Sequence, residues 1–134
     1  MGRVTYESLA GAWPTYTGEF ADRMNAIPKH VVSTTLENPE WRNSTVIRGD
    51  IPGAIGRLKA ADGGPMLVIG SRTLVHTLMA HNLVDEYRMM VFPVAVGGGG
   101  RLFPESPNKT VLKLADTRTF ASGVVVHTYQ PVAG

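Results

Sequence analysis

Residues 66–73, Met-Leu-Val-Ile-Gly-Ser-Arg-Thr, are the stretch from which the rest of this 134-residue chain is interpreted. The four apolar residues 66–69 predict a short buried strand. Gly70 permits a turn without a Cβ clash, and Ser71 can accept from the free N–H groups of a following helix. A strand that ends at a helix N-terminus suits a phosphate, because unpaired N–H groups and the positive end of the helix dipole face it. Arg72 would add a charged donor, although the same pattern also occurs in domains that bind nothing there.

The composition narrows the class of protein. The length predicts a single domain of residues 1–134, and 43% hydrophobic with 18% charged residues is ordinary for a globular protein. A net charge of +2, spread over single Lys and Arg residues, argues against a nucleic-acid partner. The chain has no cysteine, no apolar signal core and no apolar run of transmembrane length. We therefore expect a cytoplasmic protein with no membrane partner.

Apolar periodicity and breaker residues predict alternating helices and strands, followed by antiparallel strands. We expect helices over residues 4–10, 19–26 and 52–62 and after Ser71, the third of them capped by Asp50. Strands are expected over residues 30–35, 44–47, 66–69, 83–92, 111–113, 117–120 and 124–129. Asn82 is expected as a left-handed residue after the fourth helix. This order predicts an α/β sheet that is largely parallel and has an antiparallel edge.

Polar side chains follow the expected strands at three places. Ser33 and Thr34 end one strand, the turn 70–73 follows another, and Arg3 with Thr5 begins the first helix. In an open parallel sheet, ligands bind outside the carboxyl ends of the strands, so these groups could line one cleft. Each residue could also simply cap a helix or end a strand, and the residues alone leave both interpretations open.

Other sites have weaker support in the sequence. The histidines lack the spacing and carboxylate partners of a metal site, and no Gly-x-Ser-x-Gly nucleophile elbow is present. The glycine run 97–100 lacks the Lys-Ser/Thr of a phosphate-binding P-loop and is expected to be a mobile loop over a cleft. Trp13, Tyr16 and Trp41 could line a pocket or could anchor their loops to the core. We expect no metal.

Several segments, in order and spacing, resemble the dihydrofolate-reductase-like superfamily. More closely, they resemble the branch that contains the C-terminal reductase domain of the bifunctional riboflavin biosynthesis enzyme. The segments are residues 1–8, 29–36, 66–71 and 83–86, followed by Pro93 and the glycine loop before Arg101-Leu102-Phe103. The similarity runs through nearly the whole chain and is not specific to a substrate.

The resemblance implies a three-layer α/β fold with a mostly parallel central sheet, helices on both faces and a C-terminal antiparallel hairpin. It also implies an NADPH-dependent reductase that transfers hydride to a small heterocyclic or pyrimidine-type substrate, and a homodimer. A non-catalytic nucleotide-binding or assembly module that retains the fold is the alternative. The cofactor would supply the chemistry, and the protein would hold the reacting carbons in line.

The resemblance assigns cofactor contacts and leaves the catalytic residues unassigned. The implied contacts are Gly2, Arg3 and Thr5 near the adenine-side phosphates, Ser33 and Thr34 near the 2′-phosphate, and Gly70, Ser71, Arg72 and Thr73 at the pyrophosphate. An arginine suits such phosphates because its guanidinium offers a fixed fork of donors.

Two features depart from the family pattern. Family members usually have two glycines in the pyrophosphate turn, whereas Ser71 replaces the second one here. The family motif Gly-Arg-x-Thr normally follows a strand, a helix and a second strand, and this sequence begins at that motif. We expect that a leading segment precedes residue 1; strands from another chain and a differently closed sheet are the alternatives. The cofactor half of the site is thus expected in this sequence, while the catalytic half need not be.

Overall fold

The structure, a computed structural model, describes residues 1–133. It divides into two compact units, of which the first spans Met1–His81 and the second begins at Asn82.

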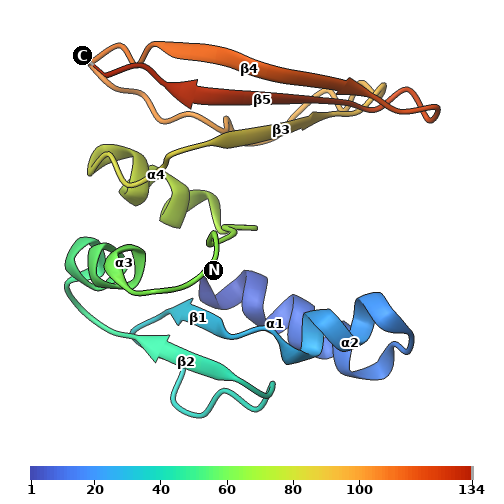
Figure 1. Ribbon diagram of the computed structural model, residues 1–134, viewed down its shortest axis with the longest axis vertical. Coiled ribbons are helices and arrows are strands. Elements are labelled where there is room, and N and C mark those ends of the chain that lie inside the picture. The colour runs from blue at the N-terminus through green and yellow to red at the C-terminus, as the bar shows by residue number, and fades with distance from the viewer. Residues whose placement is uncertain (134) are drawn as a thin grey trace. The chain divides into compact units, whose positions relative to one another are not determined.

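The first unit contains the helices and the parallel strands (Figure 1). Its elements are α1 (Arg3–Ala12), the 3-10 helix η1 (Trp13–Thr15), α2 (Glu19–Ala26), β1 (Lys29–Val32), β2 (Ser44–Ile47), α3 (Ile51–Ala60) and α4 (Arg72–Ala80). β1 and β2 pair in parallel, with Val32 opposite Ile47. The predicted bounds of α2 and β2 are confirmed, whereas α1 continues past Gly11 because nothing there interrupts its hydrogen bonding.

The predicted helix signals are present in the structure. The Asp50 side chain accepts from the Gly53 N–H at 3.1 Å, and Ser71 Oγ accepts from the Leu74 N–H at 3.3 Å. Asn82 follows α4 with a φ of 52°, in the left-handed region. Local side-chain chemistry therefore sets where α3 and α4 begin and where α4 ends.

The prediction of a buried strand over residues 66–69 is wrong. This segment has no regular secondary structure, and its side chains are 44%, 75%, 39% and 49% exposed. A strand needs a hydrogen-bonding neighbour, and among the described residues β1 pairs with β2 on one side and bridges to Gly2 on the other. Apolar composition alone does not create the missing ladder.

The core of the first unit gathers around Tyr6, Val31 and Trp41. The Trp41 N–H donates to the Tyr6 hydroxyl at 2.9 Å, and the two rings lie 6.1 Å apart. Trp41 is only 4% exposed, so this aromatic residue anchors its loop to the core. The core fixes α1 against β1 and thereby positions the first residues of the helix.

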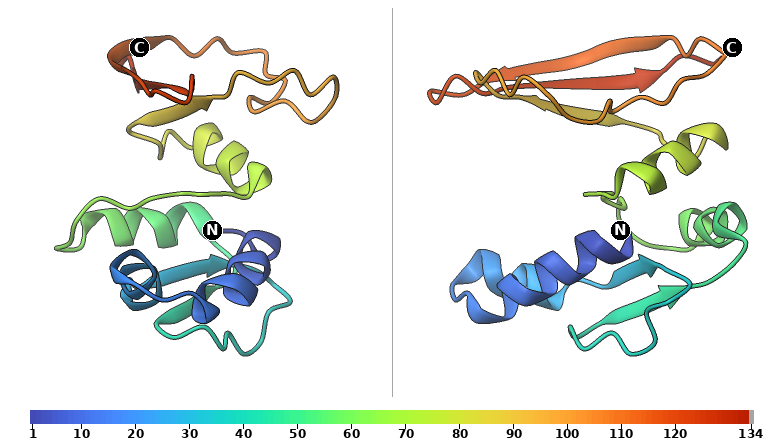
Figure 2. Two further views of the ribbon diagram at one scale, coloured as in Figure 1. Left: turned by 90° about the vertical axis from the view of Figure 1, so that its right-hand side faces the viewer. Right: turned by 180° about the vertical axis from the view of Figure 1, so that it is seen from behind.

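The second unit is an antiparallel sheet of order β3-β5-β4 (Figure 2). Its strands are β3 (Tyr87–Val91), β4 (Leu112–Thr119) and β5 (Val125–Pro131). The predicted terminal hairpin is confirmed, but the two strands expected at 111–113 and 117–120 form one strand with a bulge between Leu114 and Asp116. Within residues 1–133, no helix is long and apolar enough to cross a bilayer.

Candidate functional site

The beginnings of α1 and α4 meet in the first unit. The Gly2 N–H donates to the Gly70 carbonyl at 3.1 Å, although the two residues are far apart in sequence. A Cβ added to Gly2 would lie 2.6 Å from Ser71 Oγ, which is closer than real Cβ contacts allow. This close approach therefore depends on glycine at position 2.

Gly70 is equally constrained. Its φ of +149° lies where side chains are rarely tolerated, and an added Cβ would lie 2.9 Å from Thr5 Oγ1. The Gly70–Ser71 peptide bond is cis. The backbone at Gly70 thus packs against the side chain of Thr5 in the first turn of α1.

The polarity of this junction favours an anion. The first N–H groups of a helix have no intrahelical partner, and Gly2, the residue before α1, provides no side-chain cap. Arg72 and Thr73 open α4 and are exposed, while the Ser71 hydroxyl is used by the Leu74 N–H. Two positive helix ends side by side attract negative charge more strongly than one.

Arg3 lies at the first position of α1, and its guanidinium is engaged along the helix. Its Nη1 lies 2.8 Å and 2.9 Å from the two carboxylate oxygens of Glu7, and both side chains are nearly half exposed. Glu7 offsets part of the charge that Arg3 would offer to a phosphate. A direct cofactor contact of Arg3 stays a prediction.

Ser33 and Thr34 follow β1 beside this junction. Gly2 bridges to Val32 in parallel, and the Val32 N–H donates to the Met1 carbonyl at 2.8 Å. Ser33 Oγ accepts from the N–H groups of the residues two and three positions later, at 3.2 Å and 3.0 Å, whereas Thr34 is exposed. Ser33 therefore shapes the turn, and Thr34 is available at its surface.

Arg48 is a residue of this region that the sequence interpretation missed. Its Nη2 donates to the Leu36 carbonyl at 2.5 Å, and its Nη1 lies 3.5 Å from the Ser33 carbonyl. Because Val32 is paired with Ile47 in a parallel register, the residues after both strands are neighbours. The sequence does hold a signal for Arg48. If the two strands are aligned in parallel at their carboxyl ends, Arg48 and Ser33 are the residues that follow them.

The structure brings most of the expected residues together, but not the aromatic loop. Gly2, Thr5, Gly70 and Ser71 are in direct contact, with Arg72 and Thr73 on the adjoining helical turn. The Trp13 ring instead packs edge-on against Tyr16, which follows η1, and against Phe20 of α2, both at centroid distances of 5.4 Å. The glycine run 97–100 belongs to the second unit and lacks regular structure. Within the described chain, no group of three or more His, Asp or Glu residues could hold a metal ion.

Comparison with known proteins identifies similar sequences. The family described as the RibD C-terminal domain matches residues 1–126. The uncharacterized protein YyaP of Bacillus subtilis (strain 168) is 35% identical over 101 residues, which are 75% of this chain and 53% of YyaP. YwjB of the same strain is 28% identical over 127 residues, or 95% of this chain and 70% of YwjB. The chain thus spans about half the length of YyaP.

Two solved structures have the same type of fold. One, described as a candidate riboflavin biosynthesis protein from Shewanella sp. PV-4, has a TM-score of 0.78 and 20% identity, and the match covers 99% of this chain and 72% of that one. A pyrimidine reductase-like protein from Corynebacterium diphtheriae has a TM-score of 0.56 and 13% identity, over 78% and 50% of the two chains. These matches confirm the α/β fold class expected from the sequence.

Proposed function

Because the chain belongs to the RibD C-terminal domain family, we propose that it is an NADPH-dependent reductase that transfers hydride to a small heterocyclic or pyrimidine-type substrate. The observation that supports this proposal most is the contact between the starts of α1 and α4 at Gly2 and Gly70. It brings the starts of two helices together, and their free N–H groups would suit the pyrophosphate of a dinucleotide. The naming of one fold relative as pyrimidine reductase-like agrees with the proposed substrate class.

The described residues fit NADPH. The free N–H groups at the start of α4, with Arg72 and Thr73, would hold the pyrophosphate, and the start of α1 would face the adenine-side phosphates. Thr34 and Arg48 would hold the 2′-phosphate beside the Ser33 turn. When bound, NADPH supplies the hydride, and these residues would set its position and orientation.

The same proposal covers the organisation of the protein. We propose that residues 1–134 act as one NADPH-binding domain, that the protein is a cytoplasmic homodimer, and that its partner is a small-molecule substrate. The chain's own contribution would be cofactor binding, with the acceptor held by residues that the sequence does not assign. The cofactor, the substrate class and the homodimer are supported by the resemblance to the family.

The direct test is a calorimetric titration of the purified chain with NADPH and with NADH. We expect saturable NADPH binding and weaker NADH binding, because only NADPH has a 2′-phosphate for Arg48 and Thr34. Absence of any saturable signal at millimolar NADPH would refute the proposal for this chain. Hydride transfer is then followed by loss of NADPH absorbance with a panel of pteridine, pyrimidine and quinone acceptors. Binding with no turnover of any acceptor would favour the non-catalytic nucleotide-binding module.

Arg48→Ala is expected to weaken NADPH binding by about 10- to 100-fold, because a charge-assisted hydrogen bond contributes roughly 1.5–3 kcal/mol. NADH binding should change little, since NADH has no 2′-phosphate. The control is Arg23→Ala, which removes an arginine of α2 that is also exposed and whose guanidinium lies 3.6 Å from Glu19. Arg3→Ala should likewise affect NADPH more than NADH, but less strongly because Glu7 already engages Arg3. Equal losses for both cofactors would contradict the 2′-phosphate assignment.

A further inference from the structure

The antiparallel sheet of the second unit has two chemically different faces. Side chains alternate along each strand, so the register places eight residues on one face: Arg88, Met90, Lys113, Asp116, Arg118, Val126, Thr128 and Gln130. Glu86 precedes β3 and hydrogen-bonds to Arg88 and Gln130, and these nine residues are here called the charged face. Among the described residues paired in these strands, the opposite face carries no Asp, Glu, Lys or Arg and includes Tyr87, Met89, Val91, Thr117, His127 and Tyr129. Five residues of the charged face on the two outer strands are exposed: Arg88, Met90, Lys113, Asp116 and Arg118.

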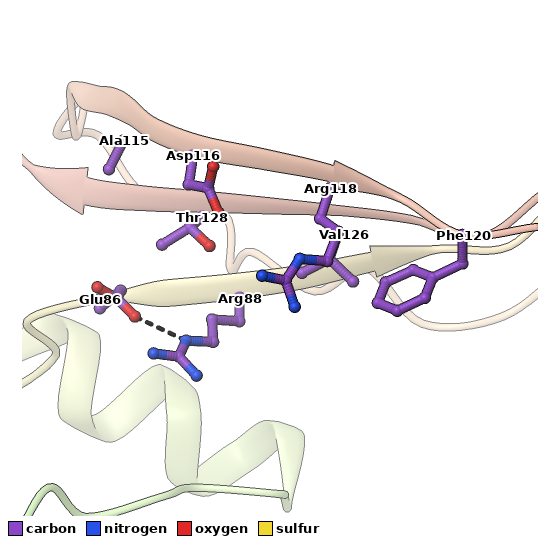
Figure 3. Close-up of a pocket in the computed structure, with 8 residues that line it drawn as sticks. All are labelled: Glu86, Arg88, Ala115, Asp116, Arg118, Phe120, Val126 and Thr128. Carbon is purple, nitrogen blue, oxygen red and sulfur yellow. Dashed lines mark hydrogen bonds and ion pairs between the residues drawn. The ribbon is translucent and has the colours of Figure 1, made fainter.

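The charged face is hollowed (Figure 3). The hollow measures about 390 Å³ and is lined by Glu86, Arg88, Ala115, Asp116, Arg118, Phe120, Val126 and Thr128. Figure 3 shows the guanidinium groups of Arg88 and Arg118 reaching over it from β3 and β4, on either side of β5. Phe120 and Val126 add apolar surface, and Phe120 is 44% exposed. A mixture of arginine, aromatic and aliphatic side chains is typical of protein interfaces.

The charges on this face are not fully paired internally. Arg88 Nε donates to Glu86 at 2.7 Å, and Gln130 donates to the other carboxylate oxygen at 3.4 Å. The hydrogen bond from Arg88, and to a smaller extent the one from Gln130, hold the pKa of Glu86 below its ordinary value. By contrast, neither Asp116 nor Arg118 forms an ion pair with any residue of the described chain. Within the hollow, one acid and one base are therefore available to a partner.

The strand register makes these charges self-complementary. Arg88, Thr128 and Asp116 form one row across the three strands, and Met90, Val126 and Arg118 form the next. A two-fold axis between two stacked sheets can run along β5 or across the strands between these rows. In the first case β3 of one copy faces β4 of the other, and Asp116 comes opposite Arg88. In the second case β4 faces β4, and Asp116 comes opposite Arg118.

We infer that the charged face binds the same face of a second copy of this chain, with Asp116 of each copy paired to an arginine of the other. Both symmetric arrangements bring this carboxylate to a guanidinium, and each contact occurs twice. A small anion fits less well, because two carboxylates line the same hollow as the two arginines. The inference rests on the homodimer proposed above and names its surface, and it does not depend on reductase activity.

The test is analytical ultracentrifugation of the full chain over a concentration series. The wild-type protein should dimerise, and Asp116→Arg should raise the dimer dissociation constant at least tenfold, since it places like charges opposite each other. Asp116→Asn should weaken the dimer in the same direction without adding a charge, which keeps the test valid if the reversal impairs folding. Asp62→Arg reverses an exposed acid in the first unit and should leave the dimer unchanged.

Charge exchange identifies the axis. Asp116→Arg combined with Arg88→Asp should restore the dimer if the axis runs along β5, whereas the combination with Arg118→Asp should restore it if the axis runs across the strands. The inference is overturned if the wild type is monomeric at every concentration, if Asp116→Arg dimerises as tightly as wild type, or if neither exchange restores the dimer. NADPH titration of each variant reports separately on the first unit, so a failure of the cofactor proposal would be distinguishable.

Discussion

Lys29→Met is expected to lower the free energy of unfolding by about 3–5 kcal/mol, because it leaves several buried carbonyl groups without a donor. Lys29 is 3% exposed, and its Nζ donates to the carbonyls of Asn25, Ile27 and Arg42 at 3.0, 2.9 and 3.0 Å. The same ammonium lies 4.3 Å from the centre of the Trp41 ring. Methionine can replace the aliphatic stem but none of these interactions.

The position of Lys29 explains why the effect should be large. Its three acceptors belong to the end of α2, the segment before β1 and the loop that leads into β2, so one side chain joins three parts of the first unit. Burial, and then the nearby Arg42, lower the pKa of Lys29 from its ordinary value, which shows the cost of keeping this charge inside. The three carbonyl groups and the face of the Trp41 ring offset that cost, because they surround the Lys29 ammonium with favourable partners.

Urea unfolding followed by far-ultraviolet circular dichroism measures the change. Lys109→Met, at an exposed position before β4, is the control and should alter stability by less than about 0.5 kcal/mol. An equally small effect at Lys29 would show that the carbonyl groups find other partners, and would contradict the role assigned to this lysine.

Gly70→Ala is expected to weaken NADPH binding by about 5- to 150-fold, because the strained backbone conformation costs roughly 1–3 kcal/mol. The new Cβ would meet Thr5 Oγ1 at 2.9 Å, in a backbone conformation that alanine rarely adopts. Relief of both conflicts requires the turn to move away from the start of α1. The two helix ends would then no longer face one anion together.

Gly11→Ala provides the matched control for this prediction. Gly11 lies in α1, and a Cβ at this position meets nothing within 4 Å, so the substitution should leave NADPH binding unchanged and slightly stabilise the helix. Calorimetric titration of both variants, with circular dichroism to verify folding, gives the comparison. Unaltered NADPH affinity in a folded Gly70→Ala protein would show that the cofactor does not depend on this turn.

Much of the local structure could be predicted from the residues. Asp50 and Ser71 have side-chain oxygens that cap the free N–H groups of a helix, and this chemistry acts within four residues. Gly70 was expected to allow a tight turn, and its positive φ agrees. The residues after β1 were expected near that turn, and the bridge from Gly2 to Val32 places them beside it.

Other features could not be predicted, because they depend on contacts between distant segments. Arg48 reaches the Ser33 turn only through the pairing of β1 with β2. From the sequence, Trp41 could line a pocket or belong to the core. In the structure it belongs to the core, where its N–H donates to the hydroxyl of Tyr6, 35 residues away. The coordination of Lys29 by three carbonyl groups has no sequence signature, since a lysine at the start of a strand is usually exposed.

The stretch from residue 66 to residue 73 separates the two kinds of information. Its second half was determined by the sequence alone, because a glycine turn and a serine cap are governed by sterics and hydrogen bonds within a few residues. Its first half was decided only by the tertiary structure, because four apolar residues become a strand only when a neighbouring backbone completes their hydrogen bonds. The approach of Gly70 to Gly2 was decided in the same way, since the core packing of α1 on β1 sets where α1 begins.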